Sequence, residues 1–280
     1  MIIALFPNEH KKQSKNLAIG ICEFLTSIGA TVVAEDEEAA HIGAKPISSV
    51  SEKEIKFLIS MGGDGTILKL IHKYAHLDAA ILGINLGHLG FLADVPIDDI
   101  YPSLQDLMNG AYTIEERVMI QGESLHGERC TAVNDIVVHR ARNPSLVEIA
   151  IHVDGLYLNT FVADGIIIAT PSGSTAYSLA AGGPIISPTL EALVITPISP
   201  HTISNRPIVL TSHNEIQIQY LSDYEPLEIR ADGLTPQILQ TGEVFRISRT
   251  KKNFKLVNLL RRDYFSTLRT KLGWAGKLRS

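Results

Sequence analysis

A strand pattern that ends in a glycine turn is the feature that most constrains the fold of this chain. Residues 57–61 are mostly apolar, and residues 62–66 then place three glycines around the single carboxylate of Asp64. The apolar spacing of residues 67–71 predicts the start of a helix. A strand, a glycine turn and a helix N-terminus form a platform for phosphate, because glycine lets backbone N–H groups approach an anion closely. A carboxylate repels phosphate, so Asp64 predicts either a metal between the two or a proton-accepting role.

The first part of the chain alternates between strand and helix patterns. Continuous apolar runs predict buried strands, and apolar residues at helical spacing predict the helices between them. Such alternation favours a parallel sheet that helices cover on both faces, with ligands at the carboxyl ends of the strands. We therefore predict an α/β domain over residues 1–110. Its expected strands are 2–6, 31–34, 57–61 and 79–85, and its expected helices are about 14–28, 67–74 and 98–109.

Beyond Gly110 the pattern changes to short strands separated by turn residues. Asp154-Gly155 lies between two apolar runs and is a strong signal for a β-hairpin. We predict a mainly β, sandwich-like domain over residues 111–253, and a C-terminal segment, 254–280, that returns to the first domain. The expected strands of the second domain are 149–153, 156–158, 166–169, 193–196, 208–210, 216–220, 227–230 and 244–247.

Composition excludes several classes of protein. The chain of 280 residues is 45% hydrophobic and 20% charged, which is typical of a globular protein. Its formal net charge of −5 gives no support for sequence-independent binding to nucleic acid, which needs a basic face. No apolar run is long enough for a membrane span, and the apolar residues 1–6 are too few for a signal sequence. The two cysteines stand in unlike contexts, so we expect no disulfide framework and a soluble cytoplasmic protein.

The turn at residues 62–66 also has an interpretation without chemistry, in which glycine and aspartate serve backbone conformation alone. Its place at the end of a buried strand, and the glycine on each side of Asp64, favour a functional role. The turn lacks both the Gly-Lys-Ser/Thr of a Walker A loop and the G-x-G-x-x-G spacing of a dinucleotide-binding turn. A dehydrogenase is therefore disfavoured.

A second candidate region is the hydroxyl-rich run at residues 170–184, which follows Asp164-Gly165. By composition alone this run is as well explained as a long loop between strands. Its serine, threonine and glycine residues can also donate many hydrogen bonds to ribose and phosphate oxygens. Tyr177 adds one aromatic face for a base or a nicotinamide ring.

Two smaller features complete the candidate residues. Asn134 and Asp135 suit vicinal hydroxyls, because one side chain donates and the other accepts, although an Asx-turn is the alternative. Phe91 follows a strand, where an aromatic side chain belongs either to the core or to a ligand-stacking surface. The ten histidines show no HExxH-type pairing, so we predict no structural metal site.

Taken together these segments resemble the NAD kinase family, which phosphorylates NAD to NADP. The Gly-Gly-Asp-Gly element alone is shared with phosphofructokinases and lipid kinases, whereas its combination with Thr-Pro-Ser-Gly-Ser-Thr-Ala-Tyr-Ser at residues 170–178 is specific. The likeness extends from Gly62 to the tail near Trp274. It implies the fold shared by NAD, diacylglycerol and phosphofructokinase-type kinases, followed by a β-sandwich. The matching segments are 62–66, 85–92, 134–135, 164–184, 196–198, 201–202 and 204–208.

The resemblance also implies a reaction and a role for each matched residue. The terminal phosphoryl group of ATP, another nucleotide or polyphosphate would pass to the 2′-hydroxyl of the adenosine ribose of NAD. Asp64 would be the general base, Mg²⁺ would accompany the donor, and the protein would form a homodimer or homotetramer. The residues implied to contact NAD are Gly65, Phe91, Asn134, Asp135, Asp164, Thr175, Ala176, Tyr177, Ser178 and Ala180. Of these, Asp164 and the residues from Thr175 to Ala180 would embrace the dinucleotide, and they could do so across a subunit boundary.

Two departures and two alternatives accompany this resemblance. Ser145 and Leu234 stand where many relatives carry a basic and a polar ligand-contacting residue, and Arg140 or Arg142 could replace the former. The alternatives are a related sugar-phosphate or lipid kinase, and a non-catalytic dinucleotide sensor. The sequence shows neither the clustered basic residues nor the apolar surface that the first would need, and the intact Asp64 disfavours the second.

Overall fold

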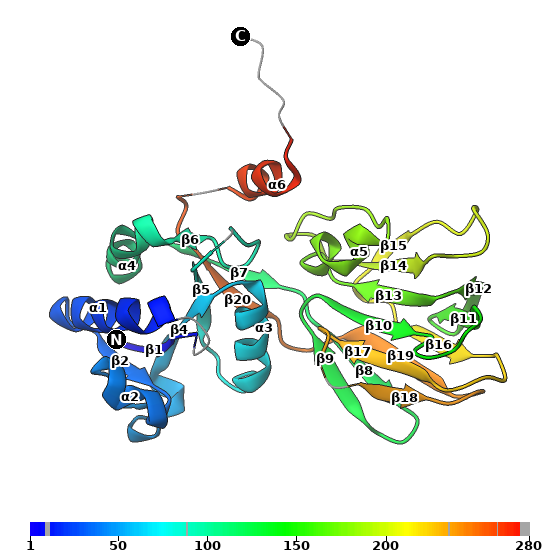
Figure 1. Ribbon diagram of the computed structural model, residues 1–280, viewed down its shortest axis with the longest axis horizontal. Helices are drawn as coiled ribbons and strands as arrows, with labels where there is room; N and C mark the ends of the chain where they lie inside the picture. Colours follow the sequence, from blue (N-terminus) through cyan, green and yellow to red (C-terminus); the bar gives the residue numbers. More distant parts are fainter. Residues whose placement is uncertain (9–11, 88, 235, 262, 275–280) are drawn as a thin grey trace, which may run out of the picture. The chain divides into compact units, whose positions relative to one another are not determined.

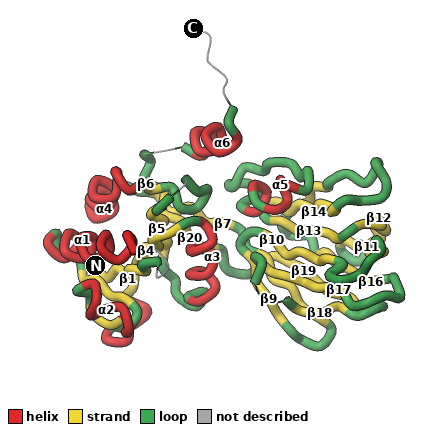
Figure 2. The backbone as a smooth tube through the Cα atoms, viewed as in Figure 1, coloured by secondary structure: helices red, strands yellow, loops and turns green. Residues whose placement is uncertain are grey.

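The chain folds into two compact units, each with its own core (Figure 1). The computed structural model describes residues 1–8, 12–87, 89–234, 236–261 and 263–274. The α/β unit comprises Met1–Glu115 and Lys255–Ser280, and the β unit comprises Glu116–Phe254. Figure 2 shows helices and strands mixed in the first unit and mostly strands in the second, which confirms the predicted fold class.

The α/β unit is built on one sheet with the strand order β3-β2-β1-β4-β5-β20-β7, and β6 pairs with β5. Its strands are β1 (Ile2–Phe6), β2 (Thr31–Ala34), β3 (Lys45–Pro46), β4 (Ile55–Gly62), β5 (Ala80–Asn85), β6 (Val95–Pro96), β7 (Thr113–Arg117) and β20 (Phe254–Asn258). Its helices are α1 (Lys12–Ser27), α2 (Asp36–Ile42), α3 (Asp64–Lys73), α4 (Ile100–Asn109) and α6 (Tyr264–Leu272). Short 3₁₀ turns lie at η1 (Ile47–Ser49), η2 (Glu52–Glu54) and η3 (Ile97–Asp99).

The central strands of this sheet are parallel and buried on both faces, as their continuous apolar runs predict. One face packs against α1 and α4, with Ile21 and Leu104 fully buried in the same core cluster as Leu82. The other face meets α3, whose Ile67 side chain lies over Gly83 of β5. The pairing of β4 with β5 places Gly62 beside Asn85, so both strands end at one edge.

The C-terminal segment returns to this sheet, as predicted. Leu256 of β20 pairs in parallel with Ile81 of β5. Within the segment 254–280, residues 262 and 275–280 lie outside the described part of the chain. Helix α2 was not predicted, because its acidic first turn gives the sequence a polar character. Gly43, with a φ of 75°, ends this helix in the left-handed conformation.

The β unit is a sandwich of two six-stranded sheets, ordered β15-β14-β13-β10-β17-β18 and β12-β11-β16-β19-β8-β9. Side chains of both sheets, such as Ile168 and Phe245, share one buried cluster. The predicted hairpin turn is present, with φ of 51° at Asp154 and 78° at Gly155. The elements are β8 (Ile120–Ser124), β9 (Arg129–Ala132), β10 (Asp135–His139), β11 (Val147–Val153), β12 (Leu156–Ala163), β13 (Gly165–Ala169), η4 (Gly173–Thr175), α5 (Tyr177–Ala180), β14 (Ala192–Ile198), β15 (Ile208–Thr211), β16 (Ile216–Tyr220), β17 (Leu227–Ala231), β18 (Gln237–Leu239) and β19 (Val244–Arg249).

No helix in the described ranges is long and apolar enough to cross a membrane.

Candidate functional site

Asp64 opens helix α3 directly after β4, and its carboxylate is held by three backbone amides. The N–H of Phe91 donates to Oδ2 at 2.9 Å, and those of Leu92 and Ala93 donate to Oδ1 at 3.0 and 2.9 Å. The helix N-terminus favours a negative charge at this position. Asp64 is therefore fixed by the segment that follows the neighbouring strand β5.

Two glycines allow this segment to approach Asp64 closely. A Cβ atom added to Gly90 would lie 2.0 Å from Oδ1 of Asp64, which is far inside contact distance. A Cβ atom added to Gly83 would lie 2.7 Å from the Cα atom of Ala93. The buried Asn85 side chain also supports the segment, since its Oδ1 accepts from the N–H of Gly87 at 2.7 Å. These contacts together set the position of the carboxylate.

Gly65 and Phe91, both predicted to touch a ligand, are direct neighbours of Asp64, Gly65 in the sequence and Phe91 through its backbone amide. Gly65 is exposed in the first turn of α3, and a Cβ atom there would meet nothing within 4 Å. The half-buried Phe91 ring lies 6.3 Å from the ring of Tyr264, and Nζ of Lys271 lies 5.7 Å from its centroid. Helix α6 thus contacts the aromatic side chain whose amide binds Asp64. His88, part of the same sequence motif, lies outside the described residues.

In the β unit, Asn134 and the hydroxyl-rich run meet at the end where β10 begins and β13 ends. The N–H of Thr170 donates to the carbonyl of Asn134 at 2.8 Å. Thr170 Oγ1 donates to the carbonyl of Val133 at 2.5 Å and accepts from the N–H of Gly173 at 3.1 Å. A Cβ atom on Gly173 would lie 1.9 Å from the carbonyl oxygen of Asn134. The structure therefore brings two separate sequence motifs into one cluster.

Asp135 is buried beside a second carboxylate, Asp232. Asp232 accepts hydrogen bonds from the N–H groups of Val133 at 2.8 Å, Asn134 at 2.8 Å and Asp135 at 3.2 Å. The Asp135 side chain accepts no hydrogen bond from any described residue. Burial, followed by repulsion from Asp232, raises the pKa of Asp135 to about 7. Asp135 can thus change its protonation near neutral pH.

The other predicted contacts in the hydroxyl-rich run differ in exposure. Tyr177 and Ala180 are exposed in α5, and Thr175 and Ala176 are half-buried just before it. Ser178 is fully buried, and its Oγ lies 2.8 Å from Oγ1 of Thr196. The first four residues can reach a ligand from the surface, whereas the hydroxyl of Ser178 faces the interior.

Asp164 lies at the opposite end of β13 from this cluster. The antiparallel pairing places Ala169 beside Asp135 and Gly165 beside His139. At about 3.3 Å per residue, Gly165 and Ala169 are roughly 13 Å apart, so Asp164 does not join the Asn134 cluster within one chain. Arg140, a predicted substitute for the residue absent at Ser145, instead binds Asp164, with Nε 2.6 Å from Oδ1. Leu234, the other departure, is 37% exposed.

The side chains of the α/β unit are compatible with an Mg²⁺ ion that the substrate phosphates carry. Among the residues that the structure describes, no group of three or more histidine, cysteine, aspartate or glutamate side chains could hold a metal ion. Magnesium commonly uses one or two carboxylates together with substrate phosphates, so it needs no such cage.

Sequence reasoning missed the supporting roles of Gly90 and Asp232. The role of Gly90 cannot be predicted from its neighbours in the sequence, because the residue that it approaches, Asp64, is distant in the chain. Asp232 has a positive φ of 49° before Gly233, and an Asp-Gly pair signals only a turn. Three amide donors converge on each of Asp64 and Asp232, and only the fold reveals that arrangement.

Two family models match most of the chain. The ATP-NAD kinase N-terminal domain matches residues 3–112, and the ATP-NAD kinase C-terminal domain matches residues 133–259. An NAD kinase of Protochlamydia amoebophila is 56% identical over 278 residues, covering 99% of this chain and 100% of that protein. An NAD kinase of Moorella thermoacetica is 38% identical over 280 residues, covering 98% and 90%.

Two solved structures resemble the whole chain. A yeast NADH kinase complexed with NADH has a TM-score of 0.86 at 25% identity, covering 100% of this chain and 89% of that one. An NAD kinase from Archaeoglobus fulgidus in complex with ATP has a TM-score of 0.76 at 25% identity, covering 99% and 100%.

Proposed function

The chain belongs to the NAD kinase family, an enzyme family that phosphorylates NAD, and on that premise we propose which residues perform the reaction. In this proposal Asp64 is the general base, and it removes the proton from the 2′-hydroxyl of the adenosine ribose of NAD. ATP provides its terminal phosphoryl group and leaves as ADP, and NADP is the other product. Family membership leaves a sugar-phosphate or lipid kinase without support.

The observation that carries this proposal is the hydrogen bonding of the Asp64 carboxylate. An ionised carboxylate has about four lone-pair positions, two on each oxygen. Leu92 and Ala93 use both positions of Oδ1, and Phe91 uses one of Oδ2. One position on Oδ2 is left for an incoming hydroxyl. A carboxylate so positioned typically contributes about 10²–10⁴-fold to the rate as a general base.

The donor phosphates require positive charge, because phosphoryl transfer depends mainly on positioning and electrostatic stabilisation. We propose that Mg²⁺ bound to the donor supplies that charge when present. The chain itself contributes the N–H groups at the start of α3 and the exposed Lys69 one turn later. Asp64 keeps its own contacts with the segment 90–93 throughout.

We propose that the β unit, Glu116–Phe254, binds the dinucleotide. Asn134 and Asp135 would bind NAD hydroxyls, and Thr175, Ala176, Tyr177 and Ala180 would line the adjacent surface. Ser178 would support this surface from beneath.

Asp164 would reach NAD only from a second copy of the chain, because β13 separates it from Asn134. The protein would then act as a homodimer or homotetramer. We further propose a cytoplasmic location, where NAD and ATP are both available.

The direct test is an assay of the purified protein with Mg²⁺, NAD and a phosphoryl donor. NADP should form with ATP, and sedimentation of dilute protein should report a dimer or a larger species. Absence of NADP with every nucleotide and polyphosphate donor would contradict the proposed reaction. A clean monomer with full activity would contradict the shared role of Asp164.

A further inference from the structure

The segment that holds Asp64 is fixed in the core at two residues and is only partly buried at a third. Leu92 and Ala93, whose amides both bind Oδ1 of Asp64, have side chains that are 4% and 0% exposed. Phe91, whose amide binds Oδ2, is only half-buried. A side chain packed in the core also fixes its own backbone, so the two Oδ1 contacts need no further support. The position of the Phe91 amide depends more on what its ring contacts.

Helix α6 contacts the Phe91 ring at two points. The centroid of the Tyr264 ring lies 6.3 Å from that of Phe91, with an angle of 44° between the rings. Aromatic rings attract one another at centroid distances of about 4.5–7 Å. Nζ of Lys271 lies 5.7 Å from the centroid of the Phe91 ring, which is within the range of a cation–π interaction. Both contacts therefore favour one position of the ring.

The sequence of α6 places both contacting residues on one face of the helix. Residues three and four positions apart share a face. On α6 this spacing groups four residues, namely Tyr264, Thr267, Leu268 and Lys271. The middle two are 6% and 5% exposed, so this face packs against the protein. The side chain of Asp263 caps the N-terminus of the helix, which stabilises its first turn.

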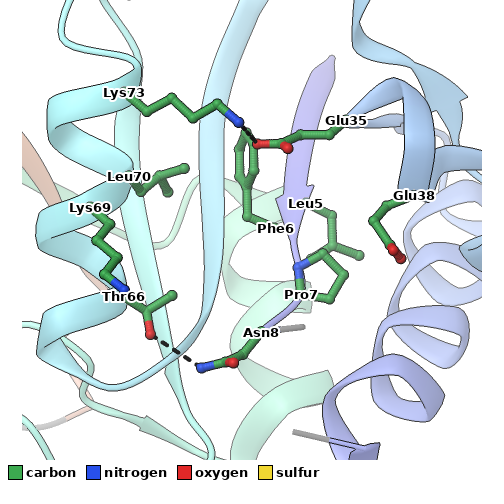
Figure 3. A pocket seen from close by; sticks show the side chains of 10 residues that line it. All are labelled: Leu5, Phe6, Pro7, Asn8, Glu35, Glu38, Thr66, Lys69, Leu70 and Lys73. Carbon is green, nitrogen blue, oxygen red and sulfur yellow. Dashed lines mark hydrogen bonds and ion pairs between the residues drawn. The ribbon is translucent and has the colours of Figure 1, made fainter. Parts of the chain in front are cut away.

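The helix on the other side of the glycine turn is held independently of α6. Figure 3 shows Asn8, just after β1, with its Nδ2 3.4 Å from Oγ1 of Thr66 in the first turn of α3. Further along α3, Nζ of Lys73 lies 2.6 Å from Oε1 of Glu35, which directly follows β2 (Figure 3). Loss of the α6 contacts should therefore leave α3, and with it the backbone of Asp64, in place.

We propose that Tyr264 and Lys271 are positioning residues for the reaction, because through the Phe91 ring they hold the Phe91 amide on Oδ2 of Asp64. Oδ2 is the oxygen that keeps a lone pair for the incoming hydroxyl. Helix α6 thereby sets the direction from which the carboxylate accepts the proton. This inference rests on the proposed role of Asp64 as general base, and it adds a support for that base from the C-terminal segment.

The first test is the steady-state kinetics of NADP formation by the full-length protein with MgATP. Tyr264→Ala should lower kcat by about tenfold and Lys271→Ala by about threefold, since an aromatic pair is worth more than an exposed cation–π contact. Tyr264→Phe keeps the ring and should remain within about twofold of wild type. Arg269→Ala removes an exposed positive charge from the same helix and is the matched control for Lys271→Ala. The KM for MgATP should not change, because the contacts of α3 remain.

The second test measures hydrogen exchange of the backbone amides and involves no turnover. In Tyr264→Ala the amide of Phe91 should exchange about tenfold faster, because its bond to Oδ2 opens more often. The amides of Leu92 and Ala93 should change by less than about twofold, because their side chains stay buried.

A double variant separates the proposed role from a general loss of stability. In an Asp64→Asn background, Tyr264→Ala should cause no further fall in kcat, because the Phe91 amide then has no base to position.

Three results would overturn the proposal. Wild-type kcat in both Tyr264→Ala and Lys271→Ala would mean that α6 does not support the base. Equal acceleration of exchange at Phe91, Leu92 and Ala93 would mean that α6 stabilises the whole segment instead of one contact. A loss from Tyr264→Ala that persists in full beside Asp64→Asn would mean that the ring acts elsewhere. Failure of the kinase function is a separate observation, because it is a wild-type protein that forms no NADP, and hydrogen exchange does not depend on it.

Discussion

Gly90 should be essential for catalysis although it has no side chain to contribute. In Gly90→Ala the added Cβ atom would start 2.0 Å from Oδ1 of Asp64, whereas real contacts of this kind are longer than 3.0 Å. The carboxylate must therefore retreat by about 1 Å, or the segment that holds it must move. A misplacement of about 1 Å in a catalytic group costs on the order of 100-fold in rate.

The assay is kcat for NADP formation, measured together with the affinity for NAD and the melting temperature. We expect kcat to fall by about 100-fold, while NAD affinity in the β unit changes little. A double-mutant cycle with Asp64→Asn separates positioning from a general disturbance. If Gly90 acts through Asp64, the double variant is no slower than Asp64→Asn alone.

Two outcomes would refute this reasoning. A Gly90→Ala protein with wild-type kcat would mean that the carboxylate tolerates the displacement. Fully additive losses in the double variant would mean that Gly90 serves something other than Asp64. A large fall in melting temperature would be addressed by repeating the cycle at lower temperature.

Three further predictions concern the β unit. Because the pKa of Asp135 is raised from 3.8 to about 7, its contribution to stability is present below pH 3.8 and is lost as pH rises through 7. The free energy of unfolding of Asp135→Asn should therefore rise relative to that of the wild type by up to about 4 kcal/mol between pH 3.8 and pH 7. A difference in unfolding free energy between the two proteins that stays constant with pH would exclude this. Gly173→Ala should destabilise the unit by about 1–3 kcal/mol and weaken NAD binding, because the new Cβ atom meets the Asn134 backbone. Ser178→Ala should lower the free energy of unfolding by about 1–3 kcal/mol, because the buried Thr196 hydroxyl loses its hydrogen bond with Ser178. A titration should find the affinity for NAD unchanged.

The strands of the parallel sheet were predictable because burial on both faces leaves a continuous apolar run in the sequence. The runs at 2–6, 31–34 and 79–85 became β1, β2 and β5 with boundaries within one residue. Helix α2 was not predictable in this way, because a short helix with an acidic first turn has little apolar periodicity. Its dependable signal was local, namely the Gly43 that ends it.

The identity of the candidate residues was easier to predict than their arrangement. Asp64 stands out in the sequence, since glycines surround it. Its amide donors come from residues 91–93, almost thirty positions away, and only the pairing of β4 with β5 brings them together. Asp164 shows the opposite relation between sequence and fold. It is close in sequence to the hydroxyl-rich run, yet the five residues of β13 separate it from the Asn134 cluster in the structure.

Burial also changed how individual side chains are interpreted. The hydroxyl of Ser178 looks available in a serine-rich run, yet it is bound to Thr196 inside the fold. The carboxyl of Asp135 looks like an ordinary ionised group, yet burial and Asp232 raise its pKa to about 7. Neither property follows from residue type, because each depends on neighbours from other strands.

The central claim is that Asp64 accepts the proton of the hydroxyl that attacks the donor. Asp64→Asn tests it most directly, because the amide oxygen can keep the hydrogen bonds from Leu92 and Ala93 while the acceptor on the Phe91 side is lost. The measurement is the single-turnover rate of NADP formation with saturating MgATP and NAD. We predict a fall of about 10²–10⁴-fold with NAD affinity within a few-fold of wild type. An unchanged single-turnover rate would contradict the claim.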